Sequence, residues 1–460
     1  MSSRPSPGNR FLHQPPGKVF AANALPMMLI MLMNGLLNII DAAFLGHFVG
    51  TDAMTAIGLV FPAVMVLIAL TNLVSGGMSS LLARQLGAGD ADGAGATVAR
   101  AHGLALAIAA GVMLVFLCTG RAVADRLSAS DPDIARMAYT YMAITVFAVP
   151  VQFALSLHAD IWRNEGRAGL VALLSVGVTL ANIGMNYVLI AEMEFGVAGS
   201  AWGTVLAQLF GLFLLVWLRG RGQGAVPLQA LRRNRWTGGW GALAGLGAPL
   251  SLSFIGIALV SSCVILALRL TAGADYADTI AAYGIVTRVL GFAFLPSMAF
   301  ALALQSTAGN NWGAGLHDRA RTVLKIAMGS ALTYGACVEV LFLTGGRAIG
   351  SAFIGDPQVI DQVADILRPM GLFYLFTGPV LSLALYFQAI GQAQKAGLLT
   401  LSKAFVLLPA LIAAFAAVKG ASAIWFAFPV SDALAVVMAV ALAIPVLKTG
   451  PHRAPLSPAQ

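Results

Sequence analysis

Charged side chains are scarce in this chain of 460 residues, in which Asp, Glu, Lys and Arg together make up only 10%. A soluble protein carries about 25% charged residues, whereas 59% of this chain is hydrophobic. The composition excludes an ordinary soluble domain and predicts a protein that crosses a membrane many times. The net charge of +8 does not indicate a nucleic-acid partner, because the basic residues lie in short segments between apolar runs rather than in one patch.

Cysteine is equally scarce, and the three that are present, Cys118, Cys263 and Cys337, all lie within apolar runs. They predict neither a disulfide framework nor a metal site. The sequence also lacks a Walker-type phosphate loop, a metal-ligand cluster and a nucleophile constellation. We therefore expect no enzyme, no cofactor and no ATP hydrolysis, so that any work done by the protein should draw on an ion gradient.

Apolar runs of membrane-spanning length recur twelve times along the chain. We expect spans at residues 19–46, 53–83, 96–120, 134–162, 168–190, 196–218, 242–272, 277–308, 321–345, 361–390, 396–418 and 420–446. The sequence thus predicts an all-α membrane protein of twelve transmembrane helices in two six-helix lobes. Its expected parts are an N-terminal tail at 1–18, an N-lobe at 19–218, a linker at 219–241, a C-lobe at 242–446 and a C-terminal tail at 447–460.

The basic residues between the spans are unevenly distributed. With the N-terminus inside, 19 Lys and Arg residues fall on the cytoplasmic side, Lys403 among them, whereas seven fall outside and Arg288 lies within a span. Because cytoplasmic loops are enriched in Lys and Arg, both termini are expected in the cytoplasm, beneath the cytoplasmic (inner) membrane. The polar, proline-rich residues 1–18 predict a disordered cytoplasmic tail.

Three short motifs of the first half recur in the second half at nearly one spacing. They are residues 85–89 and 311–315 at an offset of 226, 131–132 and 356–357 at 225, and 167–170 and 395–398 at 228. Since six spans return the chain to the side from which it started, both halves enter the membrane from the same side. The sequence therefore predicts a parallel repeat, in which a pseudo-two-fold axis along the membrane normal relates the two lobes.

The first span carries one carboxylate, Asp41, with no Lys or Arg within residues 26–46 to pair with it. Asn34 and Asn38 precede it at spacings that place all three on one helix face, and Pro26 can bend the same helix. A carboxylate in hydrocarbon costs roughly 2.5–3.5 kcal/mol on insertion scales, so such residues face a bundle interior or an aqueous cavity and bind ions or protons. The alternative is that Asp41 lies close enough to the helix end to reach water.

The run NIIDAAFLGHFVGTDAMTAIGLVFP, residues 38–62, resembles the first-helix signature of the multidrug and toxic compound extrusion (MATE) family. The Gly-Ala-Gly turns after the second and eighth spans, the two six-span halves and the overall length are similar to that family too. The resemblance covers essentially the whole chain. It implies a cation-coupled exporter of the prokaryotic type, with a V-shaped, two-lobed fold.

In many prokaryotic members of that family, the first-helix aspartate works with polar residues of the fifth and sixth helices. The resemblance assigns these roles to Asn182 and Asn186 of the fifth span and to Thr204 of the sixth, although the family pattern has an acid where this chain has Asn186. Depth supports the grouping independently, because these residues and Asp41 lie within roughly 6–12 Å of the outer boundary. The alternative for both asparagines is interhelical hydrogen bonding without a ligand.

The missing acid bears on the identity of the coupling ion. Sodium, like other hard cations, should prefer several oxygen ligands with more than one negative charge nearby. One carboxylate with amide and hydroxyl neighbours is a poorer sodium site, but it remains an adequate proton site. We therefore expect H⁺ as the coupling ion, with Na⁺ as the alternative.

Four further residues are secondary candidates. Asp432 lies mid-span, whereas Glu339 and Arg288 lie in the outer halves of their spans, and an ionisable residue at such depth is a functional candidate by default. The alternative for these three is mutual pairing or snorkelling to the interface. Tyr139, at the start of the fourth span, borders either the Asp41 cluster or the membrane interface.

Taken with the resemblance, the residues predict a proton-coupled antiporter that exports organic, often cationic, compounds across the cytoplasmic membrane. It is expected to act as a monomer in the lipid bilayer, without a nucleic-acid partner. One alternative is a flippase for lipid-linked sugar precursors, which needs a cavity rich in basic residues to hold phosphate, whereas Arg288 is the one clearly embedded basic residue in the expected spans. A third hypothesis is a channel or a membrane enzyme, and the enzyme would need a catalytic cluster that the sequence lacks.

Overall fold

The computed structural model describes residues 9–128, 131–273 and 276–448, apart from the side chains of Asn38, Ala42, Ala43 and residues 446–448. Within this part, ten helices are long and apolar enough to cross a membrane, and two bent helix pairs bring the number to twelve. The predicted all-α membrane fold is therefore confirmed. The outermost residues of the two predicted tails, 1–8 and 449–460, lie outside the described residues.

The regular structure follows the predicted order of spans. The first six spans are α2 (Pro16–Phe48), α3 (Thr51–Ala88), α4 (Ala91–Leu127), the pair α5 (Pro132–Phe147) and α6 (Val149–Asn164), α7 (Ala168–Asn186) with the π-helical turn η1 (Tyr187–Glu192), and α8 (Gly196–Gly220). The last six are α10 (Trp240–Thr271), α11 (Tyr276–Gly313), α12 (His317–Ser351), α13 (Pro357–Gly371) with η3 (Tyr374–Phe376) and α14 (Thr377–Ala389), α15 (Ala393–Leu401) with η4 (Ser402–Leu407) and α16 (Leu408–Lys419), and η5 (Ala421–Phe426) with α17 (Ala427–Lys448). The short helices α1 (Arg10–His13) and α9 (Gln229–Arg233) precede the first set and link the two sets.

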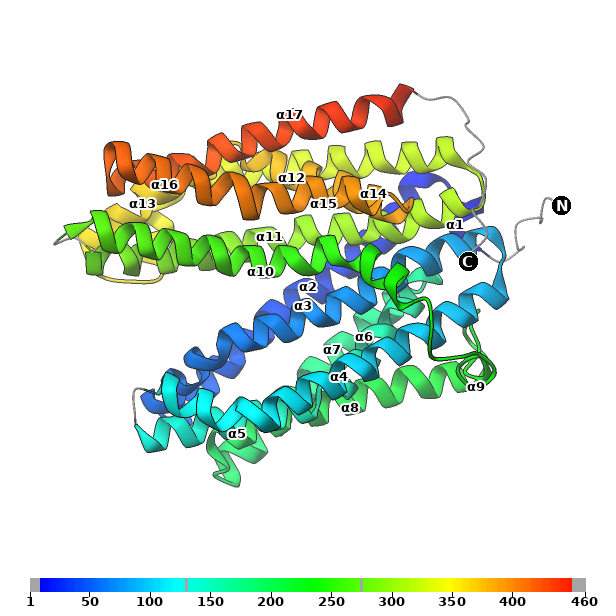
Figure 1. The fold of residues 1–460 in the computed structure, drawn as a ribbon, viewed down its shortest axis with the longest axis horizontal. Helices are drawn as coiled ribbons and strands as arrows, with labels where there is room; N and C mark the ends of the chain where they lie inside the picture. Colours follow the sequence, from blue (N-terminus) through cyan, green and yellow to red (C-terminus); the bar gives the residue numbers. More distant parts are fainter. Residues whose placement is uncertain (1–8, 129–130, 274–275, 449–460) are drawn as a thin grey trace.

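The helices form two bundles that meet at the end of the molecule where α1 and α9 lie and diverge toward the other end, which gives the V shape seen in Figure 1. The N-lobe contains α3 to α8 and most of α2, and the C-lobe contains α10 to α17. Corresponding features recur in both lobes. Gly89, just after α3, and Gly315, two residues after α11, have φ of 73° and 76°. Each fifth span also contains a π-helical turn, although it lies at the end of the span in the N-lobe and in the middle of the span in the C-lobe.

Two spans predicted as single helices, residues 134–162 and 361–390, are instead bent by 47° and 50°. In the first, Pro150 follows the break between α5 and α6, and proline removes a backbone donor and clashes with the preceding turn. In the second, the break lies at Phe373, which has φ of 65°. The backbone N–H groups of Phe373 and Leu375 donate to the Glu339 carboxylate at 3.2 and 2.9 Å. Glu339 therefore stabilises a bend within the C-lobe.

The lobes meet through backbone where their helices converge. A β-carbon at Gly87 of α3 would lie 1.9 Å from the carbonyl oxygen of Asn310 on α11, and one at Gly313 of α11 would lie 1.9 Å from that of Arg84. The two contacts are related by the sequence offset of 226 that separates the halves of the chain. Only glycine allows two helices to approach this closely.

A second pair of such contacts joins α3 to α10. A β-carbon at Gly77 would lie 2.0 Å from the Leu243 carbonyl oxygen, and one at Gly247 would lie 1.8 Å from that of Leu73. We call the contacts at these four glycines, Gly77, Gly87, Gly247 and Gly313, the interlobe seam.

The first span, α2, passes from one lobe to the other. Phe20, Ala24 and Met27, in its first turns, are buried in a core that α11, α12 and α14 of the C-lobe provide. Near its end, Leu45 is buried in the N-lobe together with Val197 of α8. A movement of α2 therefore acts on both lobes.

The prediction of a disordered tail is wrong for residues 9–18. Phe11 is buried in α1, and Arg319 of α12 donates to the carbonyl oxygens of Phe11 and Gln14 at 3.3 and 2.6 Å. Asn9 donates to the Asn310 side chain at 2.9 Å. These contacts fix the start of the chain beside the interlobe seam.

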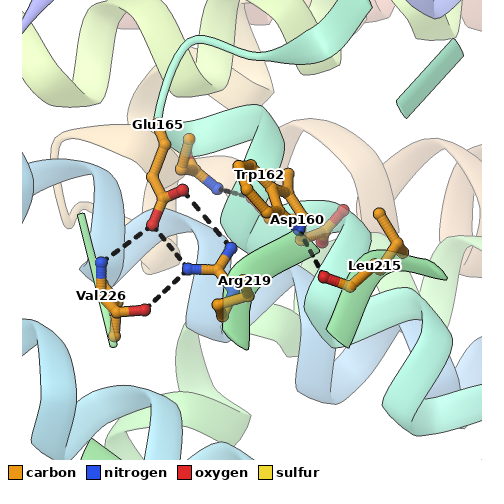
Figure 2. Close-up of polar contacts among 7 residues, drawn as sticks. Asp160, Trp162, Glu165, Leu215, Arg219 and Val226 are labelled. Atoms are coloured by element: carbon orange, nitrogen blue, oxygen red, sulfur yellow. Dashed lines mark hydrogen bonds and ion pairs between the residues drawn. The ribbon is translucent and has the colours of Figure 1, made fainter. Parts of the chain in front are cut away.

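The linker between the lobes is anchored to the N-lobe by a buried ion pair, which Figure 2 shows. Glu165, just after α6, accepts from Arg219 of α8 at 2.8 and 3.3 Å, and their side chains are only 3% and 2% exposed. Glu165 also accepts from the backbone N–H of Val226, whose carbonyl accepts from Arg219 at 2.7 Å. The indole of Trp162 lies against the guanidinium and donates to the Leu215 carbonyl. Every charge in this cluster is therefore compensated inside the protein.

We expect Glu165→Gln to lower the free energy of unfolding by about 3–5 kcal/mol, because it leaves the Arg219 charge buried without a counter-charge. Thermal or denaturant unfolding of the purified protein in lipid nanodiscs measures the change. Asp361→Asn is the control, since the Arg347–Asp361 pair at 2.9 Å is more than half exposed and such pairs contribute about 0–1 kcal/mol. Equal effects of the two substitutions would contradict the assignment.

Candidate functional site

Asp41 lies seven residues before the end of α2 and points toward the fifth span of the N-lobe. Its Oδ1 atom accepts a hydrogen bond of 2.6 Å from the amide nitrogen of Asn186, at the end of α7. Asn186 is fully buried and Asp41 is partly buried. The structure thus brings together the carboxylate and the asparagine that stands where the resembling family has an acid.

Asn182 and Thr204 complete the cluster that was predicted from the sequence. Asn182 precedes Asn186 by one helical turn, and the two amides lie 3.0 Å apart. The Nδ2 atom of Asn182 donates to the Thr204 hydroxyl on α8 at 3.1 Å. Rotating this amide by half a turn brings its nitrogen 3.1 Å from Asp41 Oδ1, where it donates, while its oxygen accepts from Thr204. Which way an amide points is assigned from its neighbours' donors and acceptors, and an ionised Asp41 favours the orientation in which the Asn182 nitrogen donates to it.

A glycine that sequence reasoning missed makes room for Asn186. A β-carbon at Gly203 of α8 would lie 2.1 Å from the Oδ1 atom of Asn186. That oxygen is buried and has no hydrogen-bond partner in the described part of the chain. Gly203 precedes Thr204 in AWGTVLAQL, and a glycine beside a polar residue in a membrane helix is the one signal that could have indicated a close helix contact here.

Tyr141, which the sequence did not single out, lies beside the cluster. Tyr141 lies close enough to Asp41 to interact with its charge, and it packs with Leu45 and Val197. Tyr139 points elsewhere, stacking on Phe116 at 5.3 Å. Because the two residues are two positions apart on α5, they face different sides of that helix.

Three further predicted residues, Asn34, Asn38 and Pro26, precede Asp41 on α2. Asn34 is exposed on α2, and the side chain of Asn38 lies outside the described residues. Pro26 lies inside the helix, which remains continuous from Pro16 to Phe48. It directly precedes Met27, which is buried in the C-lobe core, and Met28 and Met31 beyond it still pack against that core.

The remaining secondary candidates have separate places. Glu339 holds the bend of the C-lobe described above, and Arg288 is exposed on α11 without an ion pair among the described residues. Asp432 forms an ion pair with Lys403. The prediction that placed Lys403 on the cytoplasmic side is wrong, since it lies inside the span Ala393–Lys419.

The arrangement at Asp41 determines what the site can bind. It combines one carboxylate with two amides and a hydroxyl, all neutral, and no basic side chain pairs with Asp41 in the described residues. Within the same residues, no group of three or more His, Cys, Asp or Glu side chains could hold a metal ion. A lone carboxylate surrounded by neutral hydrogen-bonding groups suits a single proton or a monovalent cation.

Comparisons with known proteins agree with this architecture. A family model described as MatE matches residues 26–188 and 249–414, once in each lobe. A mouse protein named multidrug and toxin extrusion protein 2 is 26% identical over 77% of this chain, and the match spans 61% of the mouse protein. A Shewanella oneidensis protein named FAD transporter is 24% identical over 92% of this chain and 93% of its own length. A solved structure described as the outward-facing conformation of a multidrug resistance MATE family transporter has a TM-score of 0.89 at 22% identity, and the match covers 97% of this chain and 100% of that one.

We expect Gly203→Ala to displace Asn186 from Asp41, because the new methyl group would overlap the Asn186 oxygen. Overpacking of this kind costs about 1–3 kcal/mol of stability. Infrared difference spectroscopy should show a shifted carboxyl band, identified as that of Asp41 by its absence in Asp41→Asn.

The control is Gly184→Ala on α7, where a β-carbon meets nothing within 4 Å. It should leave the Asp41 band unchanged. A band that responds equally to both substitutions would show that Gly203 does not set the position of Asn186.

Proposed function

The chain belongs to the MatE family, and on that premise we propose that it is a proton-coupled antiporter that exports organic, often cationic, compounds across the cytoplasmic membrane. Its named relatives are transporters rather than enzymes. The observation that carries the proposal is the Asp41 carboxylate, which lies in a membrane-spanning helix and accepts a hydrogen bond from Asn186 at 2.6 Å. An intramembrane carboxylate without a basic partner must obtain its counter-charge from solution.

The neutral surroundings of Asp41 favour H⁺ over Na⁺ as the coupling ion. Asn186 already donates to the carboxylate, and its own free oxygen is turned toward Gly203. Sodium would need several oxygen ligands at once, of which a single carboxylate supplies at most two. A proton needs only one lone pair of the carboxylate, so the site suits it without rearrangement.

The Asn182 amide provides a way to sense the proton. When Asp41 is ionised, both asparagines can donate to it, and the Asn182 oxygen then accepts from Thr204. When Asp41 is protonated, its carboxyl group becomes a hydrogen-bond donor. The opposite orientation of the Asn182 amide then turns its oxygen toward Asp41, while its nitrogen donates to Thr204 at 3.1 Å. Protonation therefore changes the hydrogen bonds between α2, α7 and α8 without requiring a new ligand.

The path of α2 through both lobes can transmit this change. Its outer half carries Asp41 in the N-lobe, while Phe20 and Met27 are buried in the C-lobe core. Pro26 leaves one backbone hydrogen bond of the helix unmade, so bending is easiest there. We propose that protonation from the outside releases α2 to bend at Pro26, which reshapes the N-lobe and expels the substrate.

Three finer points belong to the same proposal. The helices α1 and α9 lie at the closed end of the V, which we place in the cytoplasm because the basic loop residues gather there. The protein acts as a monomer, since each lobe has its own core and the site lies within one chain. The flippase alternative gains no support, because the embedded Lys403 is neutralised by Asp432.

We expect Asp41→Asn to abolish efflux driven by an imposed pH gradient in proteoliposomes, because asparagine cannot exchange a proton. Dye efflux and proton flux, recorded together with and without sodium, measure the effect. Asp52→Asn, at the exposed start of α3, is the matched control and should retain both fluxes. Proton-driven efflux that persists in Asp41→Asn would refute the proposal, and a sodium requirement at constant pH gradient would refute its choice of ion.

We expect Pro26→Ala to slow substrate exchange several-fold, because the restored N–H group completes the α2 hydrogen bonds and opposes bending. Proton binding at Asp41, measured as proton uptake after a pH jump, should be retained. Pro62→Ala, on an exposed position of α3, should change exchange much less. If Pro26→Ala exchanges substrate at the wild-type rate, bending at this proline is not part of the cycle.

A further inference from the structure

A second carboxylate lies inside the membrane-spanning part of the chain, in the C-lobe. Asp432 of α17 forms an ion pair with Lys403 of η4, the π-helical turn between α15 and α16. Both residues lie well inside their spans, Ala393–Lys419 and Ala421–Pro445. At 1.5 Å per residue, each is about 15 Å from the nearest end of its span.

The pair is buried to a degree that requires mutual compensation. The side chain of Asp432 is 11% exposed and that of Lys403 is 27% exposed. Removing either charge would leave the other in apolar surroundings, where an unpaired ion is strongly disfavoured. π-Helical turns are rare and often occur at functional sites, and this turn directs Lys403 to Asp432.

Besides Lys403, one further polar group, the Tyr374 hydroxyl, lies near Asp432. Among the described charged groups on the elements packed against α17, Lys403 is the one that acts on Asp432. Tyr374 of η3 also lies close enough to interact with its charge, and the buried Tyr374 hydroxyl has no hydrogen-bond partner in the described residues. The adjacent Ser431 hydroxyl donates to the Phe428 carbonyl instead.

The two lobes place their carboxylates in related surroundings. At the offset of 228 that relates residues 167–170 to 395–398, Asp432 corresponds to Thr204 of the N-lobe cluster. In each lobe the carboxylate contacts the fifth span, through Asn186 in one case and Lys403 in the other, but the two contacts are at different levels, since at the same offset Lys403 corresponds to residue 175. The difference is that the N-lobe partner is neutral, whereas the C-lobe partner brings its own positive charge.

We propose that Asp432 forms a second cation site and that Lys403 is its resident cation, which closes the site to protons and monovalent metal ions from solution. The ammonium is covalently part of the chain, so it cannot leave with each cycle as a mobile ion does. The pair itself carries this inference about binding. Its consequence for transport, that one mobile cation is exchanged at Asp41 alone, rests on the proposed function.

The experiment measures cation binding in an Asp41→Asn background, in which the N-lobe carboxylate is absent. Proton uptake after a pH jump without sodium, and binding of radioactive ²²Na⁺ at constant pH, are recorded for purified protein in nanodiscs. Adding Lys403→Met should create binding of about one cation per polypeptide, because the freed carboxylate takes its counter-charge from solution. The two measurements distinguish a proton from a sodium ion.

Two variants make the result specific to the pair. Adding Asp432→Asn to Lys403→Met should abolish the new binding, since both charges are then gone. Lys419→Met, at the exposed end of the same span, should create none. No gain in Lys403→Met, or an equal gain after Asp432→Asn is added, would overturn the proposal.

A third variant tests the proposal even if Lys403→Met alone does not fold. Lys403→Met/Asp432→Asn with Asp41 intact replaces the pair by neutral side chains of similar size, which buried ion pairs tolerate well. The number of cations exchanged per substrate, obtained from the reversal potential, should equal that of the wild type, and a lower number would overturn the inference. Failure of the proposed function would appear separately, as proton-driven efflux that persists in Asp41→Asn.

Discussion

The hydrogen bond from Asn186 to Asp41 stabilises a charge in an apolar medium, and the free-energy cost of such charges constrains the whole chain. A carboxylate among neutral groups in a membrane helix must be neutralised by an ion from solution or surrounded by polar groups. The N-lobe surrounds Asp41 with the amides of Asn182 and Asn186 and the hydroxyl of Thr204, and so leaves neutralisation of its charge to a mobile ion. Elsewhere in the protein, at Glu165 and at Asp432, the compensating charge is built in.

The two lobes therefore share an architecture but differ in how their charges are compensated. The repeat relates the helix ends and the bent spans, whereas the π-helical turns lie at different points of the two fifth spans. The side chains at the related positions have diverged, with Thr204 in one lobe and Asp432 in the other. Such divergence separates a lobe that can respond to an external ion from a lobe whose polar core is self-contained. α2 joins them, because it is buried in both.

Sequence patterns were sufficient for the spans and the repeat, because length, hydropathy and helical spacing are local properties, whereas the grouping of Asp41 with Asn182, Asn186 and Thr204 came from the family resemblance. They failed where the outcome depends on contacts between distant segments. The burial of Phe11 depends on contacts with the residues just after α6 and with α12. Lys403 was assigned to the cytoplasmic side because its partner, Asp432, is distant in the sequence. Gly203 was missed for the same reason, since a glycine's role in a close approach depends on the atom that fills the space.

The interlobe seam affects how fast the molecule can change shape. At Gly77, Gly87, Gly247 and Gly313 one helix backbone rests directly on another, with no interposed side chain. The carbonyl groups that are uncovered when such surfaces part keep their own helical hydrogen bonds, so that the interlobe bonds lost are those of side chains, such as Asn310 to the Asn164 carbonyl. Each separated contact forfeits only a small amount of dispersion energy. Exposure of the interlobe seam to water can therefore begin with small rigid-body sliding of the two lobes, without local unfolding. Collective motions of this kind occur on the microsecond-to-millisecond timescale.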